Sequence, residues 1–239
     1  MSPRSSGRRA ETATTTSPRR PAAAGTGASS ARRAEIVRIA ARLFAEKGFL
    51  GTTIRDIADE ADILSGSLYH HFSSKESIAD EVLSEYWTEL LERYDSVMAA
   101  GLEPTEAMRE LIKTSVRLLE PYEFAVRCML NDWSYLVTCL PYLDANMSRI
   151  EGVWTRVIKE GIARGDFRDD VKAVLVYRTI MSSITGTARW FRPEGAVSTD
   201  QLAETMAELF LGGIMRPTGK DSTGKDSAGK QPRRRTATA

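Results

Sequence analysis

The fold of this chain is decided by residues 52–72, which read TTIRDIADEADILSGSLYHHF. Apolar residues at spacings of three and four predict a first short helix over residues 54–60, whose stripe packs inward. Asp62 marks a tight turn, and a second, very short helix is predicted over residues 65–70. Two short helices joined in this way are the pattern of a helix-turn-helix.

The second of these helices has one inward and one outward face. Leu68 and Phe72 stand four residues apart and are predicted to lie in the core. Small residues on the outward face allow close approach to a groove, and hydroxyl, imidazole and phenol groups can bind base edges or phosphates. The outward residues are Ser65, Gly66, Ser67, Tyr69 and His70. Before the first helix, Thr52 and Thr53 are candidate N-caps.

The remaining ordered sequence is helical nearly everywhere, so we predict an all-α protein of nine helices in groups of three and six. A stripe from Ile36 to Phe44 predicts the first helix, and Gly48 suits its C-terminal end. Ser73 with Glu76 predicts a capping box before the fourth helix. Helices four to nine are predicted over residues 74–99, 105–120, 122–139, 142–164, 170–190 and 198–211.

Charge is distributed unevenly along the 239 residues. Residues 1–33 carry seven Arg against one Glu, and residues 216–239 carry seven Lys or Arg against two Asp, so basic arms flank an acidic body. The predicted domains are a disordered basic arm (1–31), a helix-turn-helix domain (32–80), a ligand-binding and dimerisation domain (81–215) and a disordered basic tail (216–239). No apolar run is long enough for a membrane span, and Cys128 and Cys139 are too few for a disulfide scaffold, so we expect a cytoplasmic protein.

Four motifs in order make residues 33–75 resemble the DNA-binding domain of TetR-family regulators. They are AARLFAEKGF (40–49), TTIRDIA (52–58), GSLYHHF (66–72) and SKESI (74–78). The resemblance implies a homodimer that places one recognition helix in each of two major grooves of a palindromic double-stranded DNA operator. Carried over position by position, the family's DNA contacts fall on Thr52, Thr53, Ser65, Gly66, Ser67, Tyr69, His70 and Lys75.

This chain departs from the family pattern at two positions of the motif. Asp62 stands where Gly is usual, and Leu64 stands where Ser often caps the recognition helix, so Ser65 is an alternative cap. The domain is also acidic, since residues 34–80 hold five Lys or Arg against eight Asp or Glu. We therefore hypothesise that arginines of the arm strengthen DNA binding, namely Arg19, Arg20, Arg32 and Arg33, although a purely solubilising tail is an equal alternative.

The C-terminal half is rich in Met and aromatic residues, which suit an adaptable pocket for an apolar small-molecule effector. Simple core packing is the alternative for each of them. The candidate ligand residues are Met129, Trp133, Leu136, Met147, Trp154, Tyr177, Arg178, Met181, Arg189, Trp190 and Arg192, the arginines being suited to an anionic group. Small residues in the last two helices suggest close packing, and the family resemblance implies a homodimer through residues 170–211.

The segment LSGSLYHHFSSKESI (64–78) also resembles actinobacterial TetR-type repressors of steroid (cholesterol) breakdown, which implies an acyl-CoA-like effector such as a CoA thioester of a steroid fragment. An enzyme is the less favoured class, because the only histidines, His70 and His71, lie in the DNA-reading segment, and no cofactor or metal motif is found. A third hypothesis is a helical ligand-binding dimer without DNA binding, which the acidic body favours.

Overall fold

The computed structural model describes residues 24–216, with side chains from Ser29 onward. Nine α-helices account for most of this range, and the predicted all-α fold is confirmed. They are α1 (Ala24–Lys47), α2 (Ile54–Glu60), α3 (Ser65–Leu68), α4 (Lys75–Ala99), α5 (Pro104–Arg117), α6 (Glu123–Cys139), α7 (Tyr142–Arg164), α8 (Ala173–Thr187) and α9 (Thr199–Ile214). No strand occurs in this range, where Phe167 and Met215 form one isolated antiparallel bridge.

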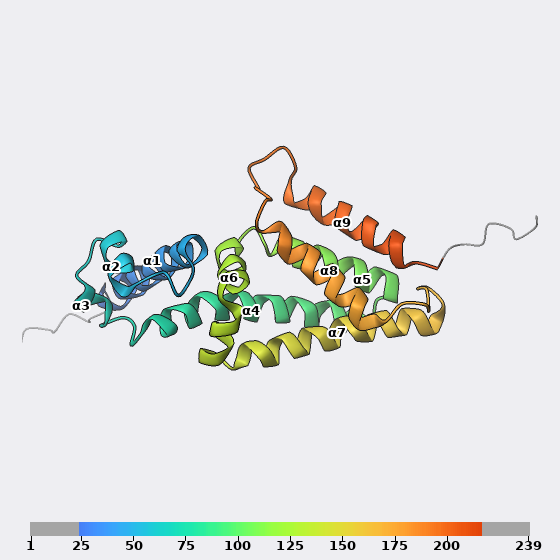
Figure 1. Cartoon of the computed structure of the whole chain (residues 1–239), viewed down its shortest axis with the longest axis horizontal. Coiled ribbons are helices and arrows are strands. Elements are labelled where there is room, and N and C mark those ends of the chain that lie inside the picture. Colours follow the sequence, from blue (N-terminus) through green and yellow to red (C-terminus); the bar gives the residue numbers. More distant parts are fainter. Residues whose placement is uncertain (1–23, 217–239) are drawn as a thin grey trace, which may run out of the picture.

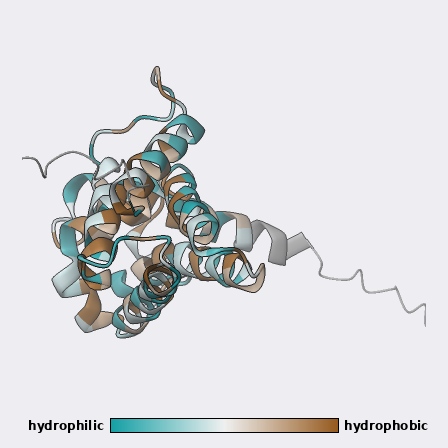
Figure 2. Ribbon diagram, turned by 90° about the vertical axis from the view of Figure 1, so that its right-hand side faces the viewer, coloured by the Kyte–Doolittle hydropathy of each residue, from teal (hydrophilic) through white to brown (hydrophobic). Residues whose placement is uncertain are grey.

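Helices α1, α2 and α3 gather at one end of an elongated molecule, and α4 runs from this end into the larger helical body (Figure 1). In the body, α9 packs chiefly on α5, α8 packs on α7, and α6 lies against α1 as well as α4. Seen along the long axis, hydrophobic residues gather mostly where helices face one another (Figure 2). Buried apolar side chains run continuously from Ile36 in α1 to Ile214 in α9.

Several predicted boundaries differ from the structure. The prediction that residues 1–31 are disordered is wrong for residues 24–31, which form the beginning of α1. This stretch can be helical because it is rich in Ala and contains no proline after Pro21. Residues 1–23 and 217–239, the rest of the predicted arms, lie outside the described residues. Arg216, placed in the predicted tail, is held to the body because its backbone N–H donates to Asp166 O at 3.0 Å.

The cap of α4 also differs from the prediction. Ser74 rather than Ser73 caps the helix, and its hydroxyl accepts from the backbone N–H of Ser77 at 3.1 Å. The Ser77 side chain closes the capping box in place of Glu76. No helix within residues 24–216 has the length and apolar character needed to traverse a bilayer.

Candidate functional site

We call the compact end formed by α1, α2 and α3, with the start of α4, the reading head.

Thr53 is the N-cap of α2. Its hydroxyl accepts from Asp56 N–H at 3.1 Å, and its own N–H donates to the Asp56 carboxylate at 2.8 Å. Hydrogen bonds from Thr53, first from its hydroxyl, lower the pKa of Asp56 to about 2. The predicted Thr53 cap is therefore confirmed.

The turn between α2 and α3 has the predicted conformation. Asp62 takes a left-handed backbone with φ of 53°, which Asp tolerates better than most residues. Leu64 occupies the N-cap position of α3 without a side-chain cap, so the alternative of a Ser65 cap is wrong. The Leu64 side chain is 79% exposed, while Leu68 and Phe72 are buried as predicted.

The outer surface of the head carries most of the predicted DNA-reading residues. Tyr69 is 57% exposed and Gly66 and His70 are exposed, whereas Ser65 and Ser67 are half-buried. Neither serine hydroxyl is bonded to another group of the described chain, so both remain free to bind a ligand outside the head. Arg55 of α2 also projects into solvent, with 85% of its side chain exposed, and was not among the predicted residues.

Two predicted contact residues are engaged inside the head instead. The Thr52 side chain is fully buried, and its hydroxyl donates to Gly48 O at 2.8 Å and Leu43 O at 3.2 Å, so its prediction as a groove contact is not supported. The Lys75 ammonium donates to Phe49 O at 2.7 Å and Thr52 O at 2.8 Å. It also lies 4.3 Å from the centre of the Phe49 ring. Lys75 therefore fastens the chain before α2 to the start of α4.

The two arginines of the hypothesised arm that the structure describes are also held by the protein. Arg32 donates to Ala61 O and pairs with Glu35, each at 2.6 Å. Arg33 pairs with Glu81 at 2.6 Å and lies 4.0 Å from the centre of the Phe72 ring. Both guanidinium groups thus stabilise the head, and the hypothesis that they serve DNA phosphates loses its support; Arg19 and Arg20 lie outside the described residues.

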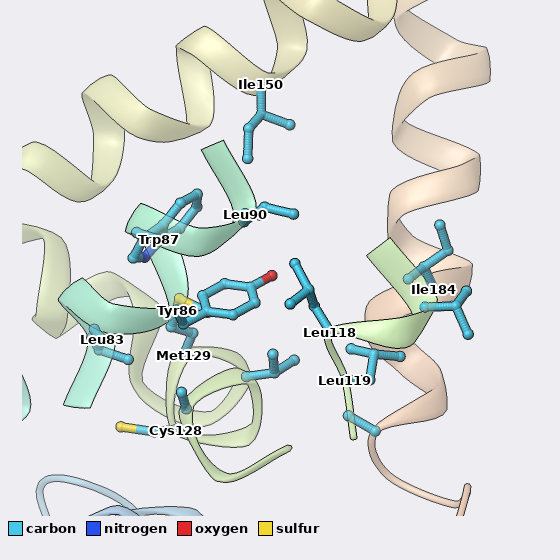
Figure 3. Packing of buried hydrophobic residues seen from close by; sticks show 14 of the residues in the cluster. Leu83, Tyr86, Trp87, Leu90, Leu118, Leu119, Cys128, Met129, Ile150 and Ile184 are labelled. Atoms are coloured by element: carbon cyan, nitrogen blue, oxygen red, sulfur yellow. The ribbon is translucent and has the colours of Figure 1, made fainter. Parts of the chain in front are cut away.

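The body contains a cavity of about 840 Å³ bounded by α4, α6, α7 and α8. Tyr86, Trp87 and Leu90 of α4 lie near Met129 of α6 and Ile150 of α7 on its inner side (Figure 3). The exposed members of its lining come from α7 and α8, so its mouth opens between those two helices. They are Asp144, Ser148, Gly152, Arg178 and Ser182.

The structure brings together only part of the predicted ligand set. Six predicted residues line the cavity: Met129, Trp133, Met147, Tyr177, Arg178 and Met181. Leu136 and Trp154 are fully buried core residues outside its lining, so core packing was the correct interpretation for both. Arg189, Trp190 and Arg192 lie beyond the end of α8, exposed and outside the cavity of this chain.

Sequence reasoning missed the wall that α4 contributes, because Tyr86, Trp87 and Leu90 were placed in the helix predicted over residues 74–99 but not among the candidate ligand residues. The cavity lining is mostly apolar, with scattered hydroxyl and indole groups, and two of its polar atoms are left unpaired. The Trp87 indole N–H and the Tyr177 hydroxyl are buried with no hydrogen-bond partner in the described structure. Burial raises the pKa of Tyr177 to about 12, so this phenol stays neutral. Charges are confined to the mouth, where Arg178 and Glu151 approach to 3.8 Å.

Two family models match the chain over the two parts just described. "Bacterial regulatory proteins, tetR family" matches residues 36–82, and "Tetracyclin repressor-like, C-terminal domain" matches residues 101–214. The chain belongs to the TetR family. The first match runs from the second half of α1 through α3 into the start of α4, and the second covers the helices from α5 to α9. The resemblance inferred from the four motifs is thereby confirmed.

Among TetR-family relatives, the transcriptional repressor KstR2 of Rhodococcus jostii is 37% identical over 199 residues, spanning 82% of this chain and 98% of its own length. The solved structure of the ketosteroid transcriptional regulator KstR2 of Mycobacterium tuberculosis is 36% identical, with a TM-score of 0.74, and covers 77% of this chain and 95% of that one. AibR, solved with isovaleryl coenzyme A and operator DNA, shares the fold at 21% identity and a TM-score of 0.66, covering 74% and 97%.

These comparisons place the chain among helix-turn-helix transcriptional repressors rather than enzymes, and its likeness to KstR2, a ketosteroid transcriptional regulator, agrees with the predicted resemblance to steroid-linked repressors. The two halves of the TetR architecture meet on α4, which carries Lys75 in the head and Tyr86 in the cavity wall. One helix therefore contacts both the DNA-binding part and the cavity.

Proposed function

We propose that this protein is a ligand-responsive transcriptional repressor that binds a palindromic operator as a homodimer and is released by a small molecule. The observation that carries the proposal is the juxtaposition of a helix-turn-helix head with a separate apolar cavity that shares α4 with it. On the head, Ser65, Ser67 and His70 are the proposed base readers, and Tyr69 the proposed phosphate contact. Arg55 of α2, which is largely exposed and lies 3.6 Å from Asp59, is a further cation of the head.

Pairing of two chains through residues 170–211 is supported by the outer faces of α8 and α9. Leu175, in the first turn of α8, is 57% exposed, and Leu209 of α9 is 69% exposed, so both helices present large apolar side chains to solvent. An apolar groove of about 440 Å³ lies between the two helices, lined in part by Leu175, Phe210 and Ile214. Side chains of a second copy would fill this groove and complete a four-helix bundle. Such a dimer must hold its two recognition helices about 34 Å apart to meet successive major grooves.

The effector that fits the cavity has an apolar body bearing an oxygen that accepts hydrogen bonds. The Trp87 N–H and Tyr177 hydroxyl lack partners, and leaving a buried polar group unpaired costs about 1–3 kcal/mol, so an accepting oxygen that reached either group would recover that cost. No cation lies in the interior, so a charged portion of the effector would remain at the mouth beside Arg178.

An acyl-CoA meets both requirements, because its acyl part is apolar with a carbonyl oxygen and its phosphates can stay outside. A CoA thioester of a steroid catabolite is the specific form that we propose, and the KstR2 relatives support this choice. Arg189, Trp190 and Arg192 at the end of α8 would then meet the projecting portion, on this chain or across the dimer.

The test begins with selection of duplexes from a random pool by the full chain, followed by fluorescence anisotropy at about 0.15 M salt. A repressor retains one palindrome in preference to scrambled duplexes. Native mass spectrometry of protein purified from its own host then identifies any co-purified effector, and adding it should release the palindrome. Failure to select any sequence would leave the alternative of a helical ligand-binding dimer without DNA binding.

A further inference from the structure

Helix α6 is interrupted where it borders the cavity. Asp132 has φ of −128° and ψ of 23°, outside the helical range, although the residues on both sides are helical. Val126, Met129 and Leu130 line the cavity just before this kink, and Trp133 lines it just after. The kink therefore lies between residues of the cavity wall, although Asp132 itself does not line the cavity.

The Asp132 side chain leaves the cavity wall and contacts the reading head. Its carboxylate accepts a hydrogen bond from the Phe49 backbone N–H at 2.7 Å, a short charge-assisted bond. Gly48 makes room for it, since a Cβ at that position would lie 3.1 Å from the carboxylate oxygen, and its φ of 79° also favours glycine. One residue earlier in α6, the Asn131 amide donates to Ala45 O at 3.3 Å, so this part of α6 caps the end of α1.

Phe49 is held on its carbonyl side by α4. Its carbonyl oxygen accepts from the Lys75 ammonium at 2.7 Å, and the same ammonium binds Thr52 O immediately before the Thr53 cap of α2. The Phe49 ring packs on Tyr135 of α6 with centroids 5.5 Å apart. The turn that leads from α1 into α2 is therefore positioned by one carboxylate from α6 and one ammonium from α4.

We infer that Asp132 is the positioning residue through which the state of the cavity is transmitted to the reading head. Filling the cavity displaces the α6 kink, weakens the bond between the Asp132 carboxylate and Phe49 N–H, and changes the orientation of α2 and α3. The inference rests on the proposed function, because it assumes that the occupied and empty cavities differ in DNA affinity. A purely structural Asp132 would instead contribute equally to operator binding in both states.

Gly152 allows the cavity to be filled without a small molecule. It lies in the middle of α7, lines the cavity, and a Cβ added there meets no heavy atom within 4 Å. Gly152→Trp is designed to place an indole in the cavity, and Gly152→Ala is the reference, because both variants gain the helix propensity that glycine lacks. The operator dissociation constant of Gly152→Trp is divided by that of Gly152→Ala, both measured by anisotropy on the selected palindrome. This ratio reports how strongly filling the cavity weakens DNA binding.

With Asp132 intact we expect this ratio to be at least about 10, within the usual range of allosteric coupling. Adding Asp132→Ala should reduce the ratio below about 3, because alanine cannot accept the Phe49 N–H bond. Asp132→Asn should retain much of it, since its amide oxygen still accepts, and Ser134→Ala, exposed on the same helix, should retain all of it. An unchanged ratio with Asp132→Ala, or a ratio near 1 with Asp132 intact, overturns the inference.

A second measurement needs no DNA and separates the two proposals. Hydrogen exchange of residues 45–52 should be faster in Gly152→Trp than in Gly152→Ala, because the Phe49 amide loses its carboxylate partner. Equal exchange in the two variants refutes transmission through Asp132 even if the palindrome binds. Selection of no palindrome while exchange responds as expected refutes the repressor function and leaves the mechanical link standing.

Discussion

Lys75 provides the sharpest test of the structure against the family pattern, since the pattern makes it a phosphate contact and the structure makes it a brace within the head. Lys75→Met removes two hydrogen bonds, at 2.7 and 2.8 Å, from a half-buried ammonium to the Phe49 and Thr52 carbonyls. Bonds to charged groups contribute about 1.5–3 kcal/mol when buried, and partial exposure reduces that value. We expect a loss of about 2 kcal/mol in the free energy of unfolding.

The two roles predict different salt dependences of operator binding. Each phosphate neutralised contributes about 0.9 to the slope of log affinity against log salt concentration, so a direct contact in both protomers makes the slope shallower by about 1.8 in Lys75→Met. If Lys75 only stabilises the head, Lys75→Met lowers operator affinity by a similar factor at every salt concentration. We expect the second result, measured by anisotropy between about 0.05 and 0.3 M salt.

The matched control is Lys159→Met, which removes one exposed cation from α7, far from the head in sequence. It should leave both the slope and the urea midpoint unchanged, which separates loss of charge from loss of the brace. A slope change of about 1.8 in Lys75→Met with an unaltered free energy of unfolding would refute the structural role.

Other parts of the molecule give further predictions. Gly161→Ala should lower the free energy of unfolding by about 1–3 kcal/mol in urea titrations, because its Cβ would lie 2.2 Å from the buried Phe167 ring; a neutral effect would contradict this packing. The pKa of Asp56 is lowered to about 2 by Thr53, so its contribution is complete above pH 3.8 and falls as the pH approaches 2. The difference in melting temperature between parent and Asp56→Asn should therefore narrow below about pH 4, and a constant difference would argue against the cap. Burial raises the pKa of the Cys128 thiol to about 12, so iodoacetamide at pH 8 should modify the other, partly exposed cysteine first by mass spectrometry; equal labelling would show that α6 opens readily.

Helical periodicity predicted the framework well because it depends on local spacing. The helix predicted over residues 142–164 is α7 to the residue, and the left-handed turn at Asp62 follows from the residue type. The N-cap of a helix was harder to predict where two neighbouring residues are equally suited to the position. Ser73 and Ser74 can both cap, and the choice depends on which register buries Ile78 and Ala79 of α4 against the rest of the head.

The predicted roles of polar side chains were wrong where the residue binds a partner that is distant in sequence. Arg33 binds Glu81, 48 residues away, and Thr52 binds the backbone of α1. No local spacing reveals such partners. The same holds for the cavity, because apolar periodicity identifies the inner face of a helix but not whether that face meets another helix or an empty volume. Trp133 and Trp154 are both tryptophans within predicted helices, and the sequence does not distinguish them. Only Trp133 lines the cavity, whereas Trp154 is fully buried in the core.

The arrangement around Phe49 also limits which molecules can act as effectors. Its N–H is held from α6 through Asp132 and its carbonyl from α4 through Lys75, and both helices form walls of the cavity. If α4 and α6 moved together, both holding groups would travel with the turn, and the head would keep its orientation relative to them. Only a difference between the two displacements can strain the backbone at Phe49. We therefore expect an effector, like the indole introduced by Gly152→Trp, to act by separating Trp87 of α4 from Met129 of α6.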